Sequence, residues 1–326
     1  MTQLTLKELE RDAEDFLKFK RAMGYSYNRG EFSLASLQRF ARHQLPAGSV
    51  RRATISLEKT AHAWLARTEN RKGNTVAQEL TVVRQLCLHR RRRDPHGFVP
   101  EQAWAPKTAL PFLPYIFSHQ EVHRLLIAAS HFQRRTIGPV LMRILLLILY
   151  CTGLRFGEAV RLRLSDVNLE RRTFFIRESK GRSRIVAFGD DLADEIKQWL
   201  AQRDRIVSDR ETQDADALFL RRDGQALSLK AASNAVTRLF RQEGLKPSRG
   251  RVGPRPYDWR HAFAVHRLTE WYHQKVDIHA RLPWLSAYMG HVNVLGTEVY
   301  LHATPELLRL ASQRFAGRLQ SARRIQ

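Results

Sequence analysis

The sequence predicts a mainly helical chain with a small β-hairpin, an α+β protein in two domains. Amphipathic stretches with helical spacing recur along the chain, five prolines interrupt it between residues 95 and 114, and only one pair of β-rich runs stands out. At 326 residues the chain is long for one domain and long enough for two, each with its own core.

The N-terminal domain, residues 1–105, is predicted to be all-helical, with four helices. Thr5 and Glu8 form a capping box that opens the first helix, and Gly24 ends it. The other three helices are expected at residues 32–44, 57–68 and 75–92. The proline-rich segment 106–117 cannot continue a helix and is predicted to be an extended linker, so the domain boundary is expected there.

The second domain, residues 118–326, opens with another capping box, Ser118 with Glu121. Helices are expected from this box to about residue 163, and then at residues 192–203, 229–243, 259–271 and 305–324. Two β-rich runs, residues 173–177 and 184–188, predict a hairpin with Lys180 at its tip.

The chain carries a large positive charge. Lys and Arg total 55 against 32 Asp and Glu, a formal charge of +23. Residues 1–116 contain 20 basic and 11 acidic side chains, and residues 117–326 contain 35 and 21. Phosphate neutralisation by Lys and Arg dominates the sequence-independent part of nucleic-acid affinity. A polyanion that contacts both domains is therefore favoured over a merely solvated basic surface.

Some of these basic residues are candidate DNA contacts. One group is a run at the end of the fourth predicted helix, Arg90, Arg91, Arg92 and Arg93, and the other lies on the hairpin, Arg182 and Arg184. The run of four is either a contact to the DNA backbone or a solvated helix end. Its place next to the linker favours the backbone contact.

Cysteine usage and hydropathy point to a reducing compartment. Cys87 and Cys151 are the only cysteines and lack the spacing of a zinc site or a disulfide framework. The most apolar run, residues 140–151, is interrupted by Arg143 and is shorter than the roughly 20 residues of a membrane span. The N-terminus lacks the layout of a secretory signal. We therefore expect a cytoplasmic protein, with no metal site and no membrane partner.

Candidate chemistry lies in four dispersed segments. They read Thr152-Gly153-Leu154-Arg155-Phe156-Gly157-Glu158, Tyr257-Asp258-Trp259-Arg260-His261, Gly290-His291 and Thr297-Glu298-Val299-Tyr300-Leu301-His302. Attack on a phosphodiester needs a nucleophile, cations on the non-bridging oxygens and an acid for the leaving oxygen. Taken singly, Arg155 fits a surface charge, His291 a structural histidine and Tyr300 an amphipathic tyrosine. Their order and spacing favour the functional interpretation.

Together these segments resemble the active site of the tyrosine recombinases, also called phage integrases. The resemblance covers about residues 118–302 well and the helical, core-binding N-terminal domain by general pattern only. It implies a nucleophile (Tyr300), phosphate-holding residues (Arg155, Arg260, His291 and Tyr257), an acid for the leaving 5′ oxygen (Lys180) and supporting residues (Glu158 and His261). Arg155 and Arg260 are also expected to favour the phenolate of Tyr300, because an unperturbed tyrosine has a pKa of about 10.

Two features depart from the family pattern. Tyr257 stands where the family usually has histidine or lysine, and a phenol can donate a hydrogen bond to phosphate but cannot be cationic. The interval from Arg260 to His291 is longer than in the family's shorter members, which implies an insertion around residues 272–281.

The resemblance implies a metal-free and cofactor-free exchange of a DNA phosphodiester for a 3′-phosphotyrosyl link, by a tetramer on two duplexes. The helix at residues 305–324 would pass between neighbouring subunits, or else pack within its own chain. Two other classes stay open: a DNA-binding protein of the same fold without turnover, and a type IB topoisomerase-like enzyme. RNA binding is the least favoured, because no RNA-binding motif is found.

Overall fold

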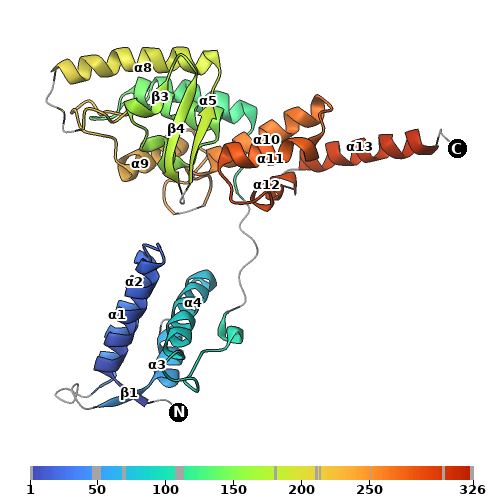
Figure 1. The fold of residues 1–326 in the computed structure, drawn as a ribbon. Coiled ribbons are helices and arrows are strands. Elements are labelled where there is room, and N and C mark those ends of the chain that lie inside the picture. The colour runs from blue at the N-terminus through green and yellow to red at the C-terminus, as the bar shows by residue number, and fades with distance from the viewer. Residues whose placement is uncertain are drawn as a thin grey trace. The chain divides into compact units, whose positions relative to one another are not determined.

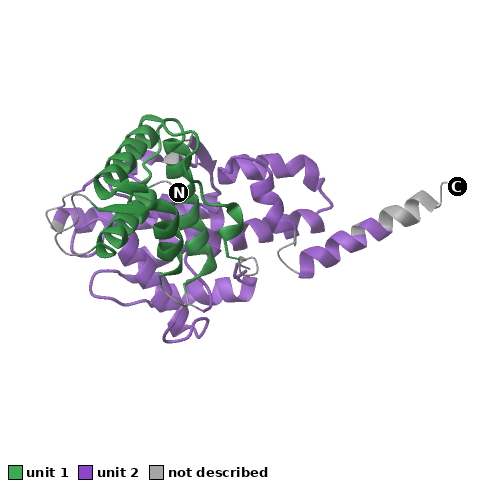
Figure 2. Cartoon of the chain, turned by 90° about the horizontal axis from the view of Figure 1, so that it is seen from below, with its two compact units in different colours: residues 1–112 green, residues 113–326 purple. Residues whose placement is uncertain are grey.

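Most of the chain is helical, and two small sheets complete it (Figure 1). The computed structural model describes residues 3–45, 53–67, 71–106, 114–179, 182–209, 212, 214–250, 252–302 and 305–323. The chain divides into two compact units, Met1–Phe112 and Leu113–Gln326, shown in different colours in Figure 2. The prediction of a mainly helical α+β chain is confirmed. The division falls within the segment 106–117 that the sequence predicts as linker.

The described residues of the first unit form four helices and one short sheet. The elements are β1 (Gln3–Thr5), α1 (Leu6–Ala22), α2 (Asn28–His43), β2 (Thr54–Ser56), α3 (Leu57–Ala66), α4 (Gly73–Arg90) and the 3₁₀ turn η1 (Gln102–Trp104). The four helices were expected, and the capping box of Thr5 with Glu8 opens α1 as predicted. Phe16, Leu37 and Trp64 lie in their shared core.

The all-helical description of this unit is wrong in one respect. β1 pairs antiparallel with β2, with Leu4 opposite Ile55. Strands of three residues are too short to produce an alternating pattern that can be recognised in a sequence. Each strand leads directly into a helix, and Thr5 and Ser56 cap α1 and α3.

The second unit combines a three-stranded sheet with helices. Its first half contains α5 (His119–Ser130), α6 (Pro139–Thr152), α7 (Phe156–Val160), η2 (Leu164–Asp166), β3 (Val167–Asn168), β4 (Thr173–Ser179), β5 (Arg182–Ala187) and α8 (Asp190–Asp209). Its second half contains α9 (Leu229–Gln242), α10 (Asp258–His273), α11 (Ile278–Met289), α12 (Leu295–Glu298), η3 (Val299–His302) and α13 (Pro305–Arg323). The sheet is antiparallel in the order β3-β4-β5.

Most elements of this unit follow the sequence prediction. Ser118 and Glu121 form the expected capping box, and β4 and β5 form the expected hairpin. The sequence did not indicate β3, which is two residues long, or α11, which contains Pro283. The predicted insertion at residues 272–281 corresponds to the end of α10, a turn and the start of α11.

The buried helix α6 carries the chain to the functional residues. Many of its apolar side chains, among them Met142, Leu146 and Leu149, are fully buried. Gly153 ends the helix with a left-handed conformation, φ +58°, and the chain then turns toward Arg155. Glycine adopts this conformation at little cost, whereas other residues rarely do.

We expect Gly153→Ala to lower the free energy of unfolding by about 3 kcal/mol, because of the left-handed backbone and the loss of space. A Cβ at Gly153 would lie 2.2 Å from Cδ1 of Phe263. Urea unfolding would measure the loss, with Gly189→Ala as control, since a Cβ there meets nothing within 4 Å. Equal losses in the two variants would contradict the prediction.

Candidate active site

Arg155 and Glu158 form a tight local unit at the start of α7. The backbone N–H of Arg155 donates to Oε2 of Glu158 at 2.9 Å, and its Nη1 donates to Oε1 at 2.7 Å. The carboxylate of Glu158 is buried, with the residue only 6 % exposed. A buried carboxylate needs such partners, so this pairing fixes the side chain of Arg155.

Arg184 from β5 reaches the same carboxylate. Its Nη2 donates to Oε2 of Glu158 at 2.7 Å and its Nη1 to Oε1 at 3.2 Å. Its Nε donates to the carbonyl oxygen of Tyr288 at 2.9 Å. The sequence pattern grouped Arg184 with DNA contacts. The structure instead places its side chain, 11 % exposed, inside the cluster around Glu158.

Arg260 enters from the first turn of α10. Its Nη1 donates to the carbonyl of Gly153 and its Nη2 to the carbonyl of Met289, both at 2.7 Å. The residue is 8 % exposed. Burial, with a further contribution from the charge of Arg155, lowers the pKa of Arg260 to about 10. This pKa is still well above neutrality, so the guanidinium keeps its charge.

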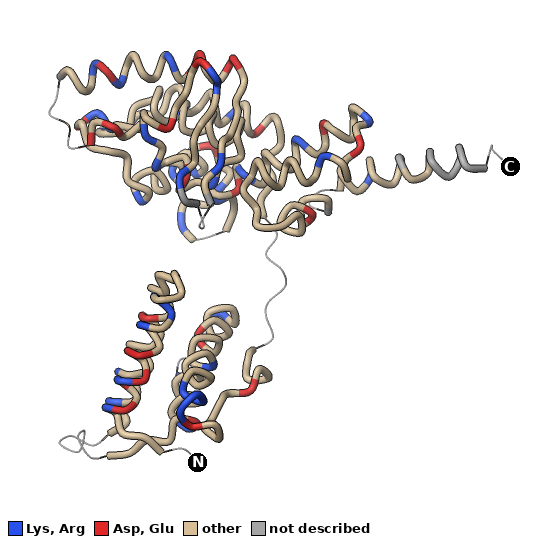
Figure 3. The backbone as a smooth tube through the Cα atoms, viewed as in Figure 1, with Lys and Arg blue, Asp and Glu red and all other residues tan. Residues whose placement is uncertain are grey.

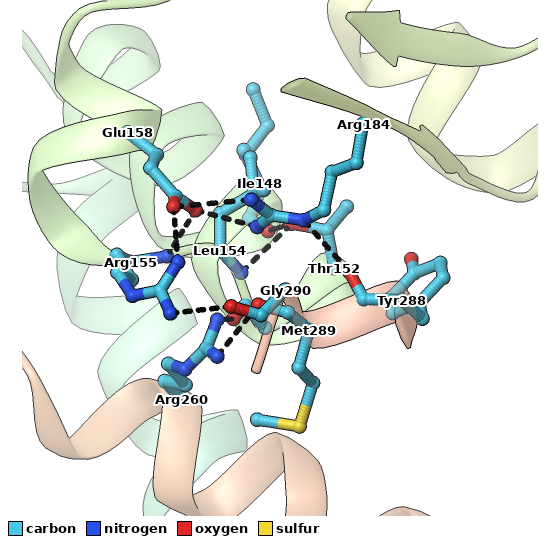
Figure 4. A network of polar contacts seen from close by, with 11 residues as sticks. Ile148, Thr152, Leu154, Arg155, Glu158, Arg184, Arg260, Tyr288, Met289 and Gly290 are labelled. Atoms are coloured by element: carbon cyan, nitrogen blue, oxygen red, sulfur yellow. Dashed lines mark hydrogen bonds and ion pairs between the residues drawn. The ribbon is translucent and has the colours of Figure 1, made fainter. Parts of the chain in front are cut away.

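The C-terminal end of α11 joins the three arginines (Figure 4). Arg155 Nη2 donates to the carbonyl of Gly290 at 2.7 Å, next to the carbonyls that accept from Arg260 and Arg184. Three successive carbonyls, at residues 288, 289 and 290, thus accept from arginines of three different elements.

Tyr300 lies on η3 beside this cluster. Its side chain is buried, at 4 % exposed, and its ring lies near the rings of His261 and His291, with centroid distances of 5.4 and 6.2 Å. Burial raises the pKa of Tyr300, while the charge of Arg260, a hydrogen bond from it and the charge of Arg155 act in the opposite direction. The expected effect of the two arginines on the phenol is therefore present, and in the DNA-free protein the effect of burial on the pKa is larger.

A spectroscopic titration would detect this raised pKa. We expect the phenolate absorbance that Tyr300 contributes, taken as the difference between wild type and Tyr300→Phe, to emerge only above pH of about 10. The unfolded chain releases this proton near its ordinary pKa while the folded chain retains it, so this tyrosine's stabilising contribution falls as pH rises above about 10. A difference signal that emerges below that pH would contradict the burial argument.

His291 follows Gly290 and contacts the segment that carries the nucleophile candidate. Its Nδ1 lies 2.7 Å from Oγ1 of Thr297, a fully buried residue three positions before Tyr300. This contact fixes the orientation of the imidazole relative to the turn. Thr297 was not singled out from the sequence, because threonine at this spacing has no distinctive pattern of its own.

Of the remaining predicted active-site residues, the structure describes the side chains of two, Tyr257 and His261. Tyr257 is the residue just before α10, and its side chain makes no capping hydrogen bond to the helix. It is about half exposed, and its ring lies 5.8 Å from that of Phe156. Nδ1 of His261 is buried without a hydrogen-bond partner, and burial lowers the pKa of this histidine. Lys180 lies outside the described residues, as does the side chain of Arg182.

The arginine run at the end of α4 is largely engaged within its own unit. Arg90 pairs with Asp12 at 2.7 Å and Arg93 with Asp15 at 2.6 Å. Arg92 lies over the ring of Phe19, and Arg91 donates to the carbonyl of Gly97. Arg91, Arg92 and Arg93 are nevertheless exposed, so a DNA contact at this run stays a prediction.

Other kinds of site find no support in the part of the chain that the structure describes. That part contains no group of three or more His, Cys, Asp or Glu placed to hold a metal ion. None of its helices is both long and apolar enough to cross a membrane.

Comparison with known proteins defines the class to which this fold and site belong. Residues 116–306 match the model of the phage integrase family. The chain is 30 % identical over 310 residues to y4rB of Sinorhizobium fredii, named as an integrase/recombinase, covering 94 % of this chain and 96 % of that protein. It is 32 % identical over 203 residues to the tyrosine recombinase XerA of Thermococcus kodakarensis, covering 62 % and 63 % of the two chains. The chain belongs to the phage integrase family, the tyrosine recombinases.

Solved structures show the same fold. The Tn1549 transposon integrase matches with a TM-score of 0.67 and 15 % identity, over 96 % of this chain and all of that one. The XerH site-specific recombinase matches with a TM-score of 0.60 and 18 % identity, over 95 % and 97 %. The family resemblance that the dispersed motifs indicated is therefore confirmed.

Proposed function

We propose that the chain is a site-specific DNA recombinase that cuts and rejoins DNA through Tyr300. The observation that supports this most is the convergence of Tyr300, Arg155 and Arg260, which are far apart in the sequence, on one small region of the second unit. A phenol beside two guanidinium groups is suited to attack on a phosphodiester, because the cations offset the charge that develops on the phosphate oxygens.

In the proposed reaction the phenolic oxygen of Tyr300 attacks the scissile phosphorus. The phenol gives up its proton to solvent, the bond to the 5′ oxygen breaks, a 3′-phosphotyrosyl link forms, and Lys180 supplies the proton to the leaving 5′ oxygen. Arg155, Arg260, His291 and Tyr257 hold the phosphate. The free 5′-hydroxyl of a second strand then attacks the phosphotyrosine and restores Tyr300. One phosphodiester is exchanged for another, so the reaction needs no ATP to drive it. None of the proposed steps uses a metal ion.

Double-stranded DNA is the proposed partner. Basic residues occur in both units (Figure 3), in agreement with the formal charge of +23. The solved XerH structure is of a complex with its difH substrate, and the Tn1549 integrase structure contains transposon right-end DNA. We propose that this chain likewise acts on duplex DNA, in the cytoplasm, through contacts that include Arg90 to Arg93 and Arg182.

A tetramer on two duplexes is the proposed active assembly. Leu307 at the start of α13 is fully buried in its own unit, while Leu308 and Phe315 farther along the helix are exposed. The exposed part of α13 is the candidate contact to a neighbouring subunit. Mass measurement of the complex with DNA would test this, and a complex with one subunit per duplex under reactive conditions would contradict it.

Covalent trapping tests the proposed chemistry. A DNA site is first selected from randomised duplexes by binding to the protein, and nicked duplexes carrying this site are then incubated with it. We expect a protein–DNA adduct that survives denaturation and that carries the strand on the 5′ side of the break. Salt-sensitive binding without any adduct would instead identify a DNA-binding protein that lacks turnover, an outcome for which Tyr257 gives a reason.

A plasmid relaxation assay distinguishes the proposed recombinase from the third class, a type IB topoisomerase-like enzyme. A type IB topoisomerase-like enzyme would relax supercoiled plasmid that lacks the selected site and would transfer no strand to a second duplex. The proposed recombinase is expected to join strands of two site-bearing duplexes and to leave the other plasmid unchanged.

A further inference from the structure

Arg184 has no role in the chemistry proposed above, yet it lies at the centre of the site. The alternation along β5 explains its position. Val186 is fully buried and Ile185 is exposed, so Arg184 shares the inward face of the strand with Val186. A long cation is thereby directed into the unit, where only paired charges are stable.

All three nitrogens of the Arg184 guanidinium are engaged by the protein. Its two Nη atoms hold the two oxygens of Glu158, and its Nε holds the carbonyl of Tyr288. A guanidinium occupied in this way on both edges does not present a fork to a phosphate. Arg184 therefore differs in kind from the exposed arginines that contact a DNA backbone.

Glu158 connects Arg184 to Arg155. Oε1 accepts from Nη1 of both arginines, at 2.7 Å from Arg155 and 3.2 Å from Arg184. Oε2 accepts from the backbone N–H of Arg155 and from Nη2 of Arg184. The fork of Arg184 fixes the plane of the carboxylate, and that plane sets the direction in which the guanidinium of Arg155 points.

The end of α11 supplies a second connection. The last carbonyls of a helix lack partners within it and form the negative end of its dipole, where cations are stabilised. Arg184, Arg260 and Arg155 each take one of these carbonyls, at residues 288, 289 and 290 (Figure 4). The end of α11 thus fixes the arginines of β5, α10 and the start of α7 relative to one another.

The backbone at Gly290 is adapted to this packing. Gly290 has φ +71°, and a Cβ there would lie 2.8 Å from Nη1 and 2.9 Å from Cζ of Arg184. Glycine is therefore needed both for the turn that ends α11 and for the close approach of Arg184.

We propose that Arg184 is a positioning residue, which acts through Glu158 and the Tyr288 carbonyl to hold Arg155 in its phosphate-binding orientation. This inference rests on the proposed recombinase function. Lysine cannot replace Arg184, because an ammonium group cannot hold both carboxylate oxygens and a carbonyl in one plane.

Single-turnover adduct formation on the nicked duplex, at saturating protein, tests this proposal. We expect Arg184→Ala to lower the rate by about 10²-fold, the scale of loss that small misplacement of a reacting group produces. Arg184→Lys is expected to recover only a small part of it. The dissociation constant for DNA should rise by far less than the rate falls, because Arg184 itself does not contact phosphate and the displaced Arg155 is one of several basic contacts.

Arg177→Ala is the matched control. Arg177 lies on the neighbouring strand β4 and pairs with the buried carboxylate of Asp166 at 2.6 Å, and that carboxylate also accepts from the backbone N–H of Arg163. The control removes an ion pair to a buried carboxylate outside the cluster, so it should leave the rate unchanged; it should lower the melting temperature less than Arg184→Ala does, because the Arg177 side chain is 53 % exposed and that of Arg184 is 11 % exposed. Equal rate losses in the two variants would show a general structural role and overturn the proposal, as would a rise of the dissociation constant for DNA in Arg184→Ala as large as the fall in rate.

A measurement on the DNA-free protein tests the positioning role of Arg184 independently of the proposed recombinase function. The Nε–H resonance of Arg155, assigned with Arg155→Lys, should broaden or shift in Arg184→Ala and stay unchanged in Arg177→Ala. An unchanged resonance in Arg184→Ala would overturn the positioning role. The expected change together with no adduct from the wild-type protein would count against the recombinase function alone.

Discussion

Replacing Tyr300 by phenylalanine is expected to abolish the covalent protein–DNA adduct and to leave folding and DNA binding nearly intact. The ring of Tyr300 is buried and packs near His261 and His291, so phenylalanine fills the same space. Loss of one hydroxyl that takes part in a hydrogen bond costs about 1 kcal/mol of stability. Without the phenolic oxygen no tyrosyl phosphate can form, and denaturing gels of the nicked duplex would show no shifted band.

Tyr150→Phe provides the control for this experiment. The Tyr150 hydroxyl lies 2.9 Å from Nδ1 of His266, in a partly buried position on α6 away from Glu158 and its arginines. Its removal is expected to have a similar effect on stability and none on the adduct. An undiminished adduct in Tyr300→Phe would show that another residue is the nucleophile.

Replacing Arg260 by alanine is expected to slow adduct formation by about 10²- to 10³-fold, the usual consequence of losing one preorganised donor to a developing charge. It should also destabilise the fold, because the carbonyls of Gly153 and Met289 lose their donors in a buried position. Each buried acceptor left without a donor costs about 1 to 3 kcal/mol. Quench kinetics and thermal unfolding would measure the two effects.

A second buried arginine allows the two effects to be separated. Arg203 on α8 is 3 % exposed and donates to the carbonyls of Ala215 and Ala217. Arg203→Ala should therefore destabilise the protein as Arg260→Ala does, while adduct formation by the folded fraction stays at the wild-type rate. If both variants slow the reaction equally, the loss reflects stability, and Arg260 has no specific part in the chemistry.

The dispersed motifs predicted the family, because they consist of residues whose chemistry is specific. Arginines at 155 and 260, a histidine after glycine at 291 and a tyrosine nine residues later are enough to indicate the family from the sequence alone. The fold brings Tyr300 within the electrostatic reach of both arginines. Local signals such as the capping boxes at Thr5 and Ser118 also gave correct helix starts, since they depend only on neighbouring residues.

Features that depend on distant contacts could not be predicted in this way. The role of Arg184 follows from its contact with Glu158, 26 residues away, and with the carbonyl of Tyr288, 104 residues away. In the sequence Arg184 sits among basic residues of a hairpin, a context typical of surface charge. The burial of Tyr300 also could not be predicted, because burial is a property of the folded chain, and its effect on the pKa is larger than that of the two arginines.

Apart from the carboxylate of Glu158, the oxygens that anchor the arginines belong to peptide groups, at Gly153, Tyr288, Met289 and Gly290. Every amino acid brings the same oxygen, so mutations at positions 288 and 289 can alter the side chains during evolution and still preserve the anchor. Selection on this part of the protein would then act on the path of the main chain. Relatives with different side chains at these positions would still hold their arginines in the same places.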